Sequence, residues 1–373
     1  MKVLVTGGAG FVGSHTVDAL VKLGLDVVIL DNLQKPVHLA GLPAYINKKA
    51  TFIEGDVRNK QLLCDILKDV DYIYHFAAYQ DYLPDFSTFF HVNSFGTALI
   101  YEIIVEKELP VKKIIVASSQ FVNGEGIYKD NDGKIYKPYR RTNEQLEKGE
   151  WDFTDDNGNK LKWQWTTESY LNPPNQYAIS KLSQEQMSIN FGERYNIPTV
   201  ALRYSIIQGS RQSFYNAYSG ACRIFSLSYY FDRAPDVYED GKMKRDFINI
   251  NDVVAANLLV LQNDKANGHV FNVGGGKAIS VYDFAVKVSE IFDRKEIKPK
   301  LTGKYRFGDT RNACSDISKI NEILGWKPKK TIIDSIHEYK NYLINQKDIQ
   351  NILDFTEKNM NKLNVIRKSK VSK

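Results

Sequence analysis

A glycine-rich turn near the N-terminus constrains the fold more than any other feature of this chain. The sequence Thr6-Gly-Gly-Ala-Gly-Phe-Val-Gly13 joins a short apolar stretch, 2–6, to a longer stretch, 11–23, whose apolar residues recur at helical spacing. These patterns predict a buried strand followed by a helix. The glycines permit a tight turn and close packing of helix on strand. Free N–H groups at the helix N-terminus can then bind phosphate.

Strand and helix patterns continue to alternate after this turn. Further strands are expected at 26–30, 51–53, 72–76, 113–117, 198–204, 247–250 and 270–273, and helices at 93–106 and 176–195. Such alternation predicts an α/β fold with a parallel, doubly wound sheet of the Rossmann type.

The order of these patterns also predicts a division into parts. We expect a Rossmann-like dinucleotide-binding domain over residues 1–204 and a smaller mixed α/β domain over 205–345. Residues 243–264 are expected to pack on the first domain. An amphipathic helix and a disordered basic tail are expected over 346–373.

A polar insertion interrupts the first domain at about 120–175. It contains Asp130-Asn-Asp-Gly133 and Asp156-Asn-Gly158, which are tight-turn signals flanked by β-prone residues. We expect two hairpins here. An aromatic insertion of this kind could act as a lid over a site, or could be a passive surface elaboration.

Composition limits the classes of partner. The net charge of +6 is accounted for by the six basic residues and no acid between 358 and 373, so no basic stripe for nucleic acid remains. The chain lacks an apolar run long enough to span a bilayer and an N-terminal signal peptide, so we expect no membrane partner and a cytoplasmic location. The cysteines, Cys64, Cys222 and Cys314, are too few and too scattered for disulfides or a metal site.

Asp31 suggests which dinucleotide the glycine turn binds. It ends the second predicted strand, where its carboxylate can accept hydrogen bonds from both ribose hydroxyls and would repel a 2′-phosphate. The next residues, from Asn32 to Lys35, include no arginine. This pattern favours NAD over NADP. Asp56 and the small residues after Phe76 follow the third and fourth strands, where a cofactor can lie against the chain.

Tyr177-Ala-Ile-Ser-Lys181 is the most informative candidate for chemistry. The spacing places a phenol and an ammonium on one face of a helix. A nearby ammonium favours the phenolate, so Tyr177 can act as a base closer to neutral pH. In a chain with 22 tyrosines this spacing also arises by chance, and an exposed helix pair is the alternative.

Taken together, these motifs resemble the extended short-chain dehydrogenase/reductases, in the branch of nucleotide-sugar epimerases and dehydratases. The resemblance covers roughly 1–345 and includes Asn93-Ser-Phe-Gly-Thr97, Arg245-Asp-Phe247 and Phe271-Asn-Val-Gly-Gly275. Segments 77–90 and 203–220 are most similar to the dTDP-L-rhamnose 4-epimerase type. That type is expected to carry cysteine pairs in the insertion, and this chain has none there.

The resemblance implies a set of site residues. Ser119, Tyr177 and Lys181 would be catalytic, with Ser118 as the alternative serine. The residues implied to bind NAD are Gly7, Gly10, Phe11, Val12, Gly13, Asp31, Asn32, Asp56, Val57, Phe76, Ala77, Ala78, Asn93, Tyr177 and Lys181. Those implied to bind a nucleotide sugar are Ser118, Gln120, Gln212, Asn216, Arg245 and Arg306, the two arginines on the diphosphate. Ser205-Ile206 stands where many relatives have Phe-Asn, so that asparagine contact is missing.

The residues after Ser119 bear on the reaction. Related dehydratases have an Asp-Glu pair there for the loss of water, whereas this chain has Gln120 and Phe121, which do not titrate. We therefore expect NAD-dependent inversion at C4 of a dTDP-hexose or 6-deoxyhexose through a transient 4-keto sugar. A UDP-glucose or UDP-N-acetylglucosamine type of 4-epimerase, a 4-ketoreductase or dehydratase, and a non-catalytic dinucleotide sensor are the alternatives. The resemblance also implies a homodimer through helices at about 84–107 and 176–195.

Overall fold

A parallel sheet forms the centre of the N-terminal half. The computed structural model describes residues 1–81, 83–215, 220–347 and 349–370. Its seven-stranded sheet has the order β13-β9-β5-β4-β1-β2-β3, and every neighbouring pair is parallel. The strands are β1 (Lys2–Thr6), β2 (Asp26–Asp31), β3 (Thr51–Glu54), β4 (Tyr72–His75), β5 (Lys113–Ser119), β9 (Thr199–Tyr204) and β13 (Val270–Val273). The predicted Rossmann-like sheet is confirmed.

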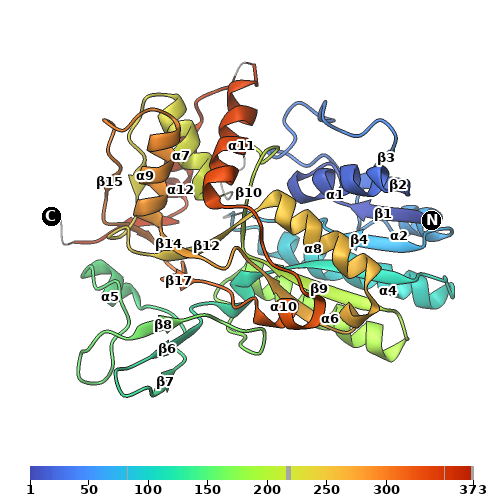
Figure 1. Ribbon diagram of the computed structural model, residues 1–373, viewed down its shortest axis with the longest axis horizontal. Helices are drawn as coiled ribbons and strands as arrows, with labels where there is room; N and C mark the ends of the chain where they lie inside the picture. The colour runs from blue at the N-terminus through green and yellow to red at the C-terminus, as the bar shows by residue number, and fades with distance from the viewer. Residues whose placement is uncertain (82, 216–219, 348, 371–373) are drawn as a thin grey trace.

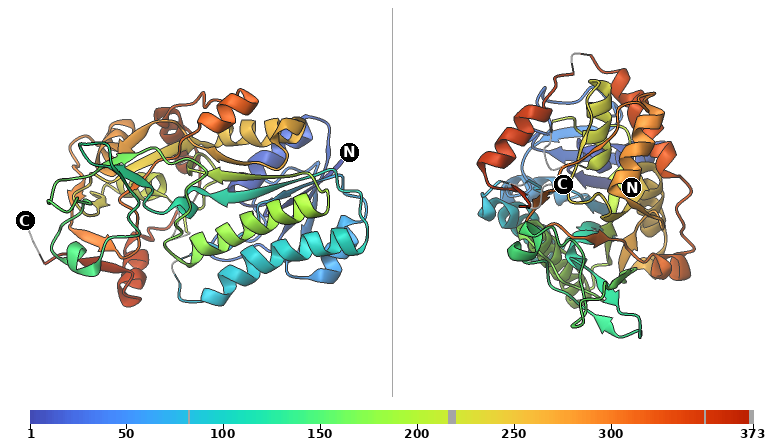
Figure 2. Two further views of the ribbon diagram at one scale, coloured as in Figure 1. Left: turned by 90° about the horizontal axis from the view of Figure 1, so that it is seen from below. Right: turned by 90° about the vertical axis from the view of Figure 1, so that its left-hand side faces the viewer.

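Helices cover both faces of this sheet (Figure 1). Successive residues of β1 point to opposite faces, so Val3 and Val5 enter one apolar core and Leu4 enters another. The first core is closed by α1 (Phe11–Lys22) and α8 (Ile250–Gln262), and the second by α2 (Lys60–Leu67), α4 (Gly96–Glu106) and α6 (Gln176–Arg194). Figure 2 shows α4 and α6 side by side on the underside.

One continuous helical stretch is unusually apolar. Residues Phe86–Glu106 comprise α3 (Phe86–Phe89), the π-helical turn η1 (Phe90–Phe95) and α4. The expectation that no apolar stretch is long enough to span a bilayer is wrong by length and composition alone, but 56% of the most apolar part of this stretch is buried inside the protein. That burial is typical of a core helix in a globular protein.

A second group of elements packs at the carboxyl ends of the central strands. Strands β10 (Ile206–Gln208), β12 (Lys244–Asn249), β14 (Ala278–Ser280) and β17 (Asn312–Ala313) form a mixed sheet. Helices α7 (Ala221–Tyr230), α9 (Val281–Ile291) and α11 (Ile332–Ile344) build a third apolar core beside it. The predicted mixed α/β part is confirmed, while the domain boundaries at 204 and 345 stay a prediction.

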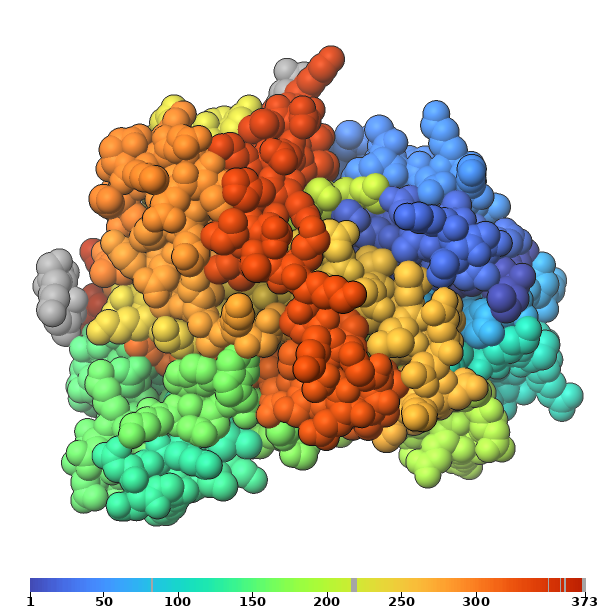
Figure 3. Space-filling model, viewed as in Figure 1, coloured from blue at the N-terminus to red at the C-terminus, as the bar shows by residue number. Residues whose placement is uncertain are grey.

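The insertion forms a small projecting unit at the lower left of Figures 1 and 3. Strands β6 (Ile127–Lys129), β7 (Ile135–Tyr136) and β8 (Lys162–Gln164) form an antiparallel sheet, and α5 (Asn143–Glu147) lies beside it. The turn at 130–133 joins β6 to β7, as predicted. The second turn, at 156–158, is closed by a single bridge between Thr154 and Lys160.

The C-terminal tail differs from its prediction. Helix α12 (Leu353–Lys362) is followed by strand β18 (Ile366–Lys368), which pairs antiparallel with β16 (Lys304–Arg306). The Lys370 N–H then donates to the Glu147 carbonyl at 2.8 Å. Disorder was expected because of the basic composition, but strand pairing and this contact with the insertion order the segment as far as residue 370.

Candidate active site

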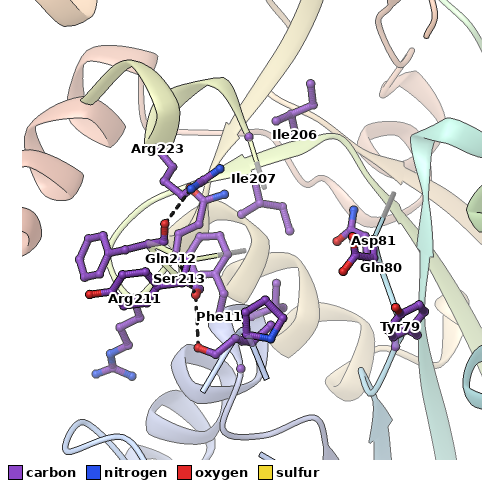
Figure 4. Close-up of a pocket in the computed structure, with 18 of the residues that line it drawn as sticks. Phe11, Tyr79, Gln80, Asp81, Ile206, Ile207, Arg211, Gln212, Ser213 and Arg223 are labelled. Carbon is purple, nitrogen blue, oxygen red and sulfur yellow. Dashed lines mark hydrogen bonds between the residues drawn. The ribbon is translucent and has the colours of Figure 1, made fainter. Parts of the chain in front are cut away.

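A cavity of about 1090 Å³ lies where the carboxyl ends of β1, β4 and β5 meet the second group of elements. A single-ligand site usually has a volume of roughly 300–1,000 Å³. This cavity can therefore hold more than one ligand. Figure 4 shows Gln212, Ser213 and Arg211 on one side of it and Tyr79, Gln80 and Asp81 on the other.

The glycine turn borders this cavity and has the geometry that the sequence predicted. Gly7 has φ +67°, and a Cβ at that position would lie 2.7 Å from the Ala77 nitrogen. A Cβ at Gly13 would lie 2.2 Å from the Gly7 oxygen. A side chain fits at neither position. Gly7, Gly10, Phe11, Val12 and Gly13 all border the cavity, so a dinucleotide can approach the backbone here.

Asp31 lies at the end of β2 and also borders the cavity. Its carboxylate accepts backbone N–H bonds from Ala9 at 3.0 Å and Leu33 at 2.9 Å. Those bonds fix the carboxylate and leave lone pairs for ribose hydroxyls. The turn and this acid fit the adenosine half of NAD.

Asp56 borders the cavity with its neighbours Asn32 and Val57. The Arg58 side chain binds both oxygens of Asp56, at 2.8 and 2.7 Å, and holds the pKa of that carboxyl down at about 2. The sequence has no arginine directly after Asp31, but the fold places Arg58 beside Asp56 near the same part of the cavity. The sequence analysis did not identify Arg58. Because the Asp56 carboxylate binds the Arg58 guanidinium and balances its charge, this arginine is not free to bind a 2′-phosphate.

Phe76, Ala77 and Ala78 border the cavity after β4, but Asn93 does not. Asn93 is fully buried, and its amide bonds the backbone N–H and carbonyl of Tyr79 at 2.7 and 3.0 Å. It also donates to the Ser180 hydroxyl at 2.9 Å. The side chain of Asn93 connects the loop after β4 to α6 instead of facing the cavity, so its expected contact with the cofactor stays a prediction.

Tyr177 and Lys181 project from the first turns of α6 into the cavity. Asn175 caps this helix by accepting the Ala178 N–H at 2.9 Å. Burial raises the pKa of Tyr177 to about 12, although a hydrogen bond with Ser119 lowers it. The expected low pKa of Tyr177 is therefore wrong for the ligand-free protein, because the effect of burial outweighs that of the hydrogen bond with Ser119.

Lys181 is equally buried. Desolvation lowers the pKa of its ammonium to about 7, although Glu185 opposes the shift. Its Nζ donates to the Gln184 side-chain oxygen, and the Gln184 amide donates to Thr97 at 2.9 Å. This polar chain positions the lysine beneath the cavity.

The two serines after β5 have different partners. The Ser118 hydroxyl donates to Glu185 at 2.6 Å, and Glu185 also binds Arg203 at 2.7 Å. Ser119 instead bonds Tyr177. Both serines border the cavity, but only Ser119 is joined to the candidate base.

The candidate substrate residues divide into two groups. Gln212, Arg245 and Arg306 border the cavity. Gln120 is buried outside the cavity wall, and its side-chain oxygen lies 3.5 Å from the Ser315 hydroxyl, so its expected contact with the substrate stays a prediction. Asn216 lies outside the described residues.

The two arginines offer positive charge in different ways. Arg245 is buried, and its guanidinium donates to the carbonyl oxygens of Lys244, Thr310 and Arg311 at 2.8, 2.8 and 3.0 Å. Because carbonyl groups carry no net charge, these bonds fix the Arg245 cation without neutralising it. Arg306 pairs with Asp309 at 2.7 Å and lies over the Tyr238 ring at 5.3 Å. Both cations suit a diphosphate.

Sequence reasoning missed several polar cavity residues. Tyr79, Gln80 and Asp81 lie in the loop after β4, and Arg223 enters from α7. The first three could have been found, because side chains after a parallel strand lie at the carboxyl edge of the sheet, where such folds bind ligands. Arg223 gives no such signal, since it lies inside a helix whose place depends on the tertiary fold.

The insertion contributes no cavity wall between Phe121 and Asn175, within the residues that the structure describes. It reaches the site indirectly through Arg141. That side chain binds Glu239 at 2.8 Å and the Asp309 carbonyl at 2.8 Å. The insertion therefore supports the cavity loop at 308–311 from behind and does not cover the ligand-free site.

Two family models match this chain. The NAD dependent epimerase/dehydratase family matches residues 3–146, and GDP-mannose 4,6 dehydratase matches 158–339. The dTDP-L-rhamnose 4-epimerase of Burkholderia thailandensis is 31% identical over 356 residues, which cover 94% of this chain and 97% of that protein.

Solved structures agree with this grouping. The UDP-glucose 4-epimerase of Thermotoga maritima with UDP-glucose has a TM-score of 0.75 and 27% identity, covering 92% of this chain and 99% of that one. The UDP-glucuronic acid 4-epimerase of Bacillus cereus in complex with NAD has a TM-score of 0.73 and 25% identity, with coverage of 92% and 96%.

Proposed function

Because this chain belongs to the NAD-dependent epimerase/dehydratase family, we propose that it inverts C4 of a nucleotide-activated hexose or 6-deoxyhexose. One observation carries the proposal. Ser119, Tyr177 and Lys181 border the same cavity as Arg245 and Arg306, so one nucleotide sugar can reach a base and the diphosphate cations together. The enzyme is NAD-dependent, and the glycine turn with Asp31 fits that cofactor.

The chain's own groups supply the acid–base chemistry. Tyr177 takes the proton of the C4 hydroxyl and later returns it, and Ser119 bonds the same sugar oxygen. The Lys181 ammonium stabilises the phenolate that forms. NAD, which the glycine turn and Asp31 would hold, would supply the acceptor and donor for the C4 hydride. Inversion follows if the 4-keto sugar recovers the hydride on its other face. Burial raises the pKa of Tyr177 in the ligand-free protein, so the phenol needs a nearby positive charge to act as a base closer to neutral pH.

We propose a thymidine diphosphate as the activating group. The support is the similarity of segments 77–90 and 203–220 to the dTDP-sugar type and the relative from Burkholderia thailandensis. A uridine nucleotide is the second candidate, since the relative from Thermotoga maritima was solved with UDP-glucose. Dehydration is disfavoured, because Gln120 and Phe121 replace the acid pair that would remove water.

A panel of dTDP- and UDP-sugars, followed by NMR for C4 inversion without added cofactor, tests the proposal. We expect turnover on at least one dTDP-sugar and its loss in Tyr177→Phe. A ketoreductase would instead need a stoichiometric supply of NADH or NADPH. Undiminished inversion of every accepted sugar by Tyr177→Phe would refute the proposed role of the phenol.

A second copy of the chain is the partner that we propose. Phe90 and Phe95 on η1 and Ile179 on α6 are 38%, 48% and 44% exposed, which gives neighbouring helices an apolar outer face. Such faces are typical of symmetric dimer contacts. Light scattering after gel filtration should give a dimer mass for the wild type and for Leu23→Asp, at the exposed residue that follows α1, and a monomer mass for Phe90→Asp. A monomeric wild type at micromolar concentration would contradict this.

A further inference from the structure

The cavity extends beyond the candidate catalytic residues to an end that the C-terminal helix α12 helps to close. Leu353, Glu357 and Met360 of this helix border the cavity, and Met360 is only 7% exposed. Both family models end before α12, the later one at residue 339. Nothing in the matched family regions assigns a role to this helix.

The order of groups along the cavity indicates what this end receives. The sugar must lie at Tyr177, and the diphosphate suits Arg245 and Arg306. In a nucleotide sugar the base lies on the opposite side of the diphosphate from the sugar, so it must extend beyond the arginines. Strand β18 pairs Ile366 with Arg306 in register, so the C-terminal segment lies directly beside that arginine.

Charged contacts hold α12 in this position. Lys304 in β16 binds Glu357 at 2.5 Å and Asp236 of β11 (Asp236–Val237) at 2.7 Å. Arg233 binds Asp354 at 2.7 Å. Each of these pairs is partly exposed and contributes modestly to stability. Together they fix the orientation of the helix and keep Glu357 at the cavity wall.

We propose, on the basis of the proposed function, that α12 forms the wall that receives the pyrimidine base of the nucleotide sugar. Leu353 and Met360 provide apolar surface for the ring. The Glu357 carboxylate has lone pairs beyond its bond to Lys304 and can accept the imide N–H of thymine or uracil. Cytosine has an acceptor at that ring nitrogen, so the same carboxylate discriminates against it.

Nucleotide binding to the NAD-saturated protein tests this wall separately from catalysis. Calorimetric titrations with dTDP, UDP and CDP would be compared for the wild type, Met360→Trp, Glu357→Gln and the control Phe355→Trp. Phe355 lies on the same helix but is 67% exposed and does not border the cavity. We expect dTDP and UDP to bind about tenfold more weakly to Met360→Trp, because the larger side chain fills the base site.

Glu357→Gln provides a test that does not change the volume of the side chain. Its amide can donate to cytosine, so the preference for UDP over CDP should fall by about tenfold while NAD affinity stays unchanged. An unchanged dTDP affinity in Met360→Trp, or an unchanged UDP preference in Glu357→Gln, would overturn the proposal. If the wild type and the two variants bind the nucleotides as expected but the wild type inverts no sugar, the proposed reaction is refuted. The proposed role of α12 in binding the base is then still supported.

Discussion

Ser118 and Ser119 are adjacent in the chain but have different partners. Ser118 donates to Glu185, whose carboxylate is shared with the buried guanidinium of Arg203. Ser119 bonds the phenol of Tyr177. Only Ser119 can therefore hold the reacting sugar oxygen beside the base.

Replacing each serine by alanine separates the two roles. Ser119→Ala should lower kcat by about a hundredfold with little change in KM, because its hydroxyl acts mainly on the developing charge. Ser118→Ala should cost far less, since Glu185 keeps its bonds to Arg203. Steady-state kinetics on the accepted nucleotide sugar provide the measurement. A larger loss of kcat in Ser118→Ala would assign the catalytic hydroxyl to Ser118 instead.

Lys181 gives the ligand-free protein a pH-dependent stability. Burial lowers the pKa of Lys181 to about 7, below the value of 10.5 for an exposed lysine. Between these values the unfolded chain binds more protons than the folded chain, so the contribution of Lys181 to stability rises with pH. From pH 8 to 9 the free energy of unfolding of the wild type should rise by about 1.4 kcal/mol relative to Lys181→Met.

Urea unfolding of the NAD-free proteins at both pH values measures this difference. Lys148→Met is the control, because Lys148 lies on the surface and should give no pH-dependent difference. A constant difference between the wild type and Lys181→Met would mean that Lys181 stays charged in the fold. The sequence predicted that Tyr177 and Lys181 share a face, but their pKa values depend on burial by distant segments, which spacing does not report.

At the scale of elements, the insertion is joined to the cavity loop by buried charge. Arg141 and Arg311 share the Glu239 carboxylate at 2.8 and 2.9 Å, and all of these side chains are at most 2% exposed. Glu125 lies 3.5 Å from Arg141, and burial raises the pKa of that carboxyl to about 7. Because the Glu125 charge is costly to bury, Glu239 is the main counter-charge for Arg141, whereas Arg311 also pairs with Asp152 and Asp240.

Glu239→Gln should destabilise the protein by about 3–5 kcal/mol, because it leaves the buried guanidinium of Arg141 without its close counter-charge. Arg311 keeps its ion pairs with Asp152 and Asp240. Urea unfolding measures this loss. Glu144→Gln removes an exposed carboxylate on the same insertion and should leave the unfolding midpoint unchanged. A similar midpoint for Glu239→Gln and the wild type would show that the network is not required for stability.

For the whole molecule, local patterns predicted the central sheet and missed the long-range pairings. The apolar runs at 2–6 and 113–117 are β1 and the start of β5, because buried parallel strands need continuous apolar sequence. Strand β17 and the pairing of β18 with β16 gave no signal, since each is short and its partner is distant in the chain. The same limit applies to the site: Tyr177 follows a local spacing, whereas the cavity-lining side of α12 is set by contacts with Lys304 and Arg233.

The choice between NAD and NADP depends on the whole fold, because residues of the central sheet and of the second group of elements line the same cavity. A ligand that binds only the folded chain raises its stability by about 2.7 kcal/mol at a hundred times its Kd. NAD should therefore raise the melting temperature. The fixed Asp31 carboxylate should repel the 2′-phosphate of NADP, and Arg58 should not offset this repulsion because Asp56 holds it.

Thermal melts of cofactor-free protein with NAD or NADP test the role of Asp31 in this selection. The wild type and the control Asp26→Asn, at the exposed start of β2, should be stabilised strongly by NAD and weakly by NADP. Asp31→Asn removes the negative charge, so the two cofactors should then give nearly equal shifts, with a smaller shift for NAD. Equal stabilisation of the wild type by NADP would show that Arg58 leaves Asp56 to bind the phosphate, and would contradict selection by Asp31.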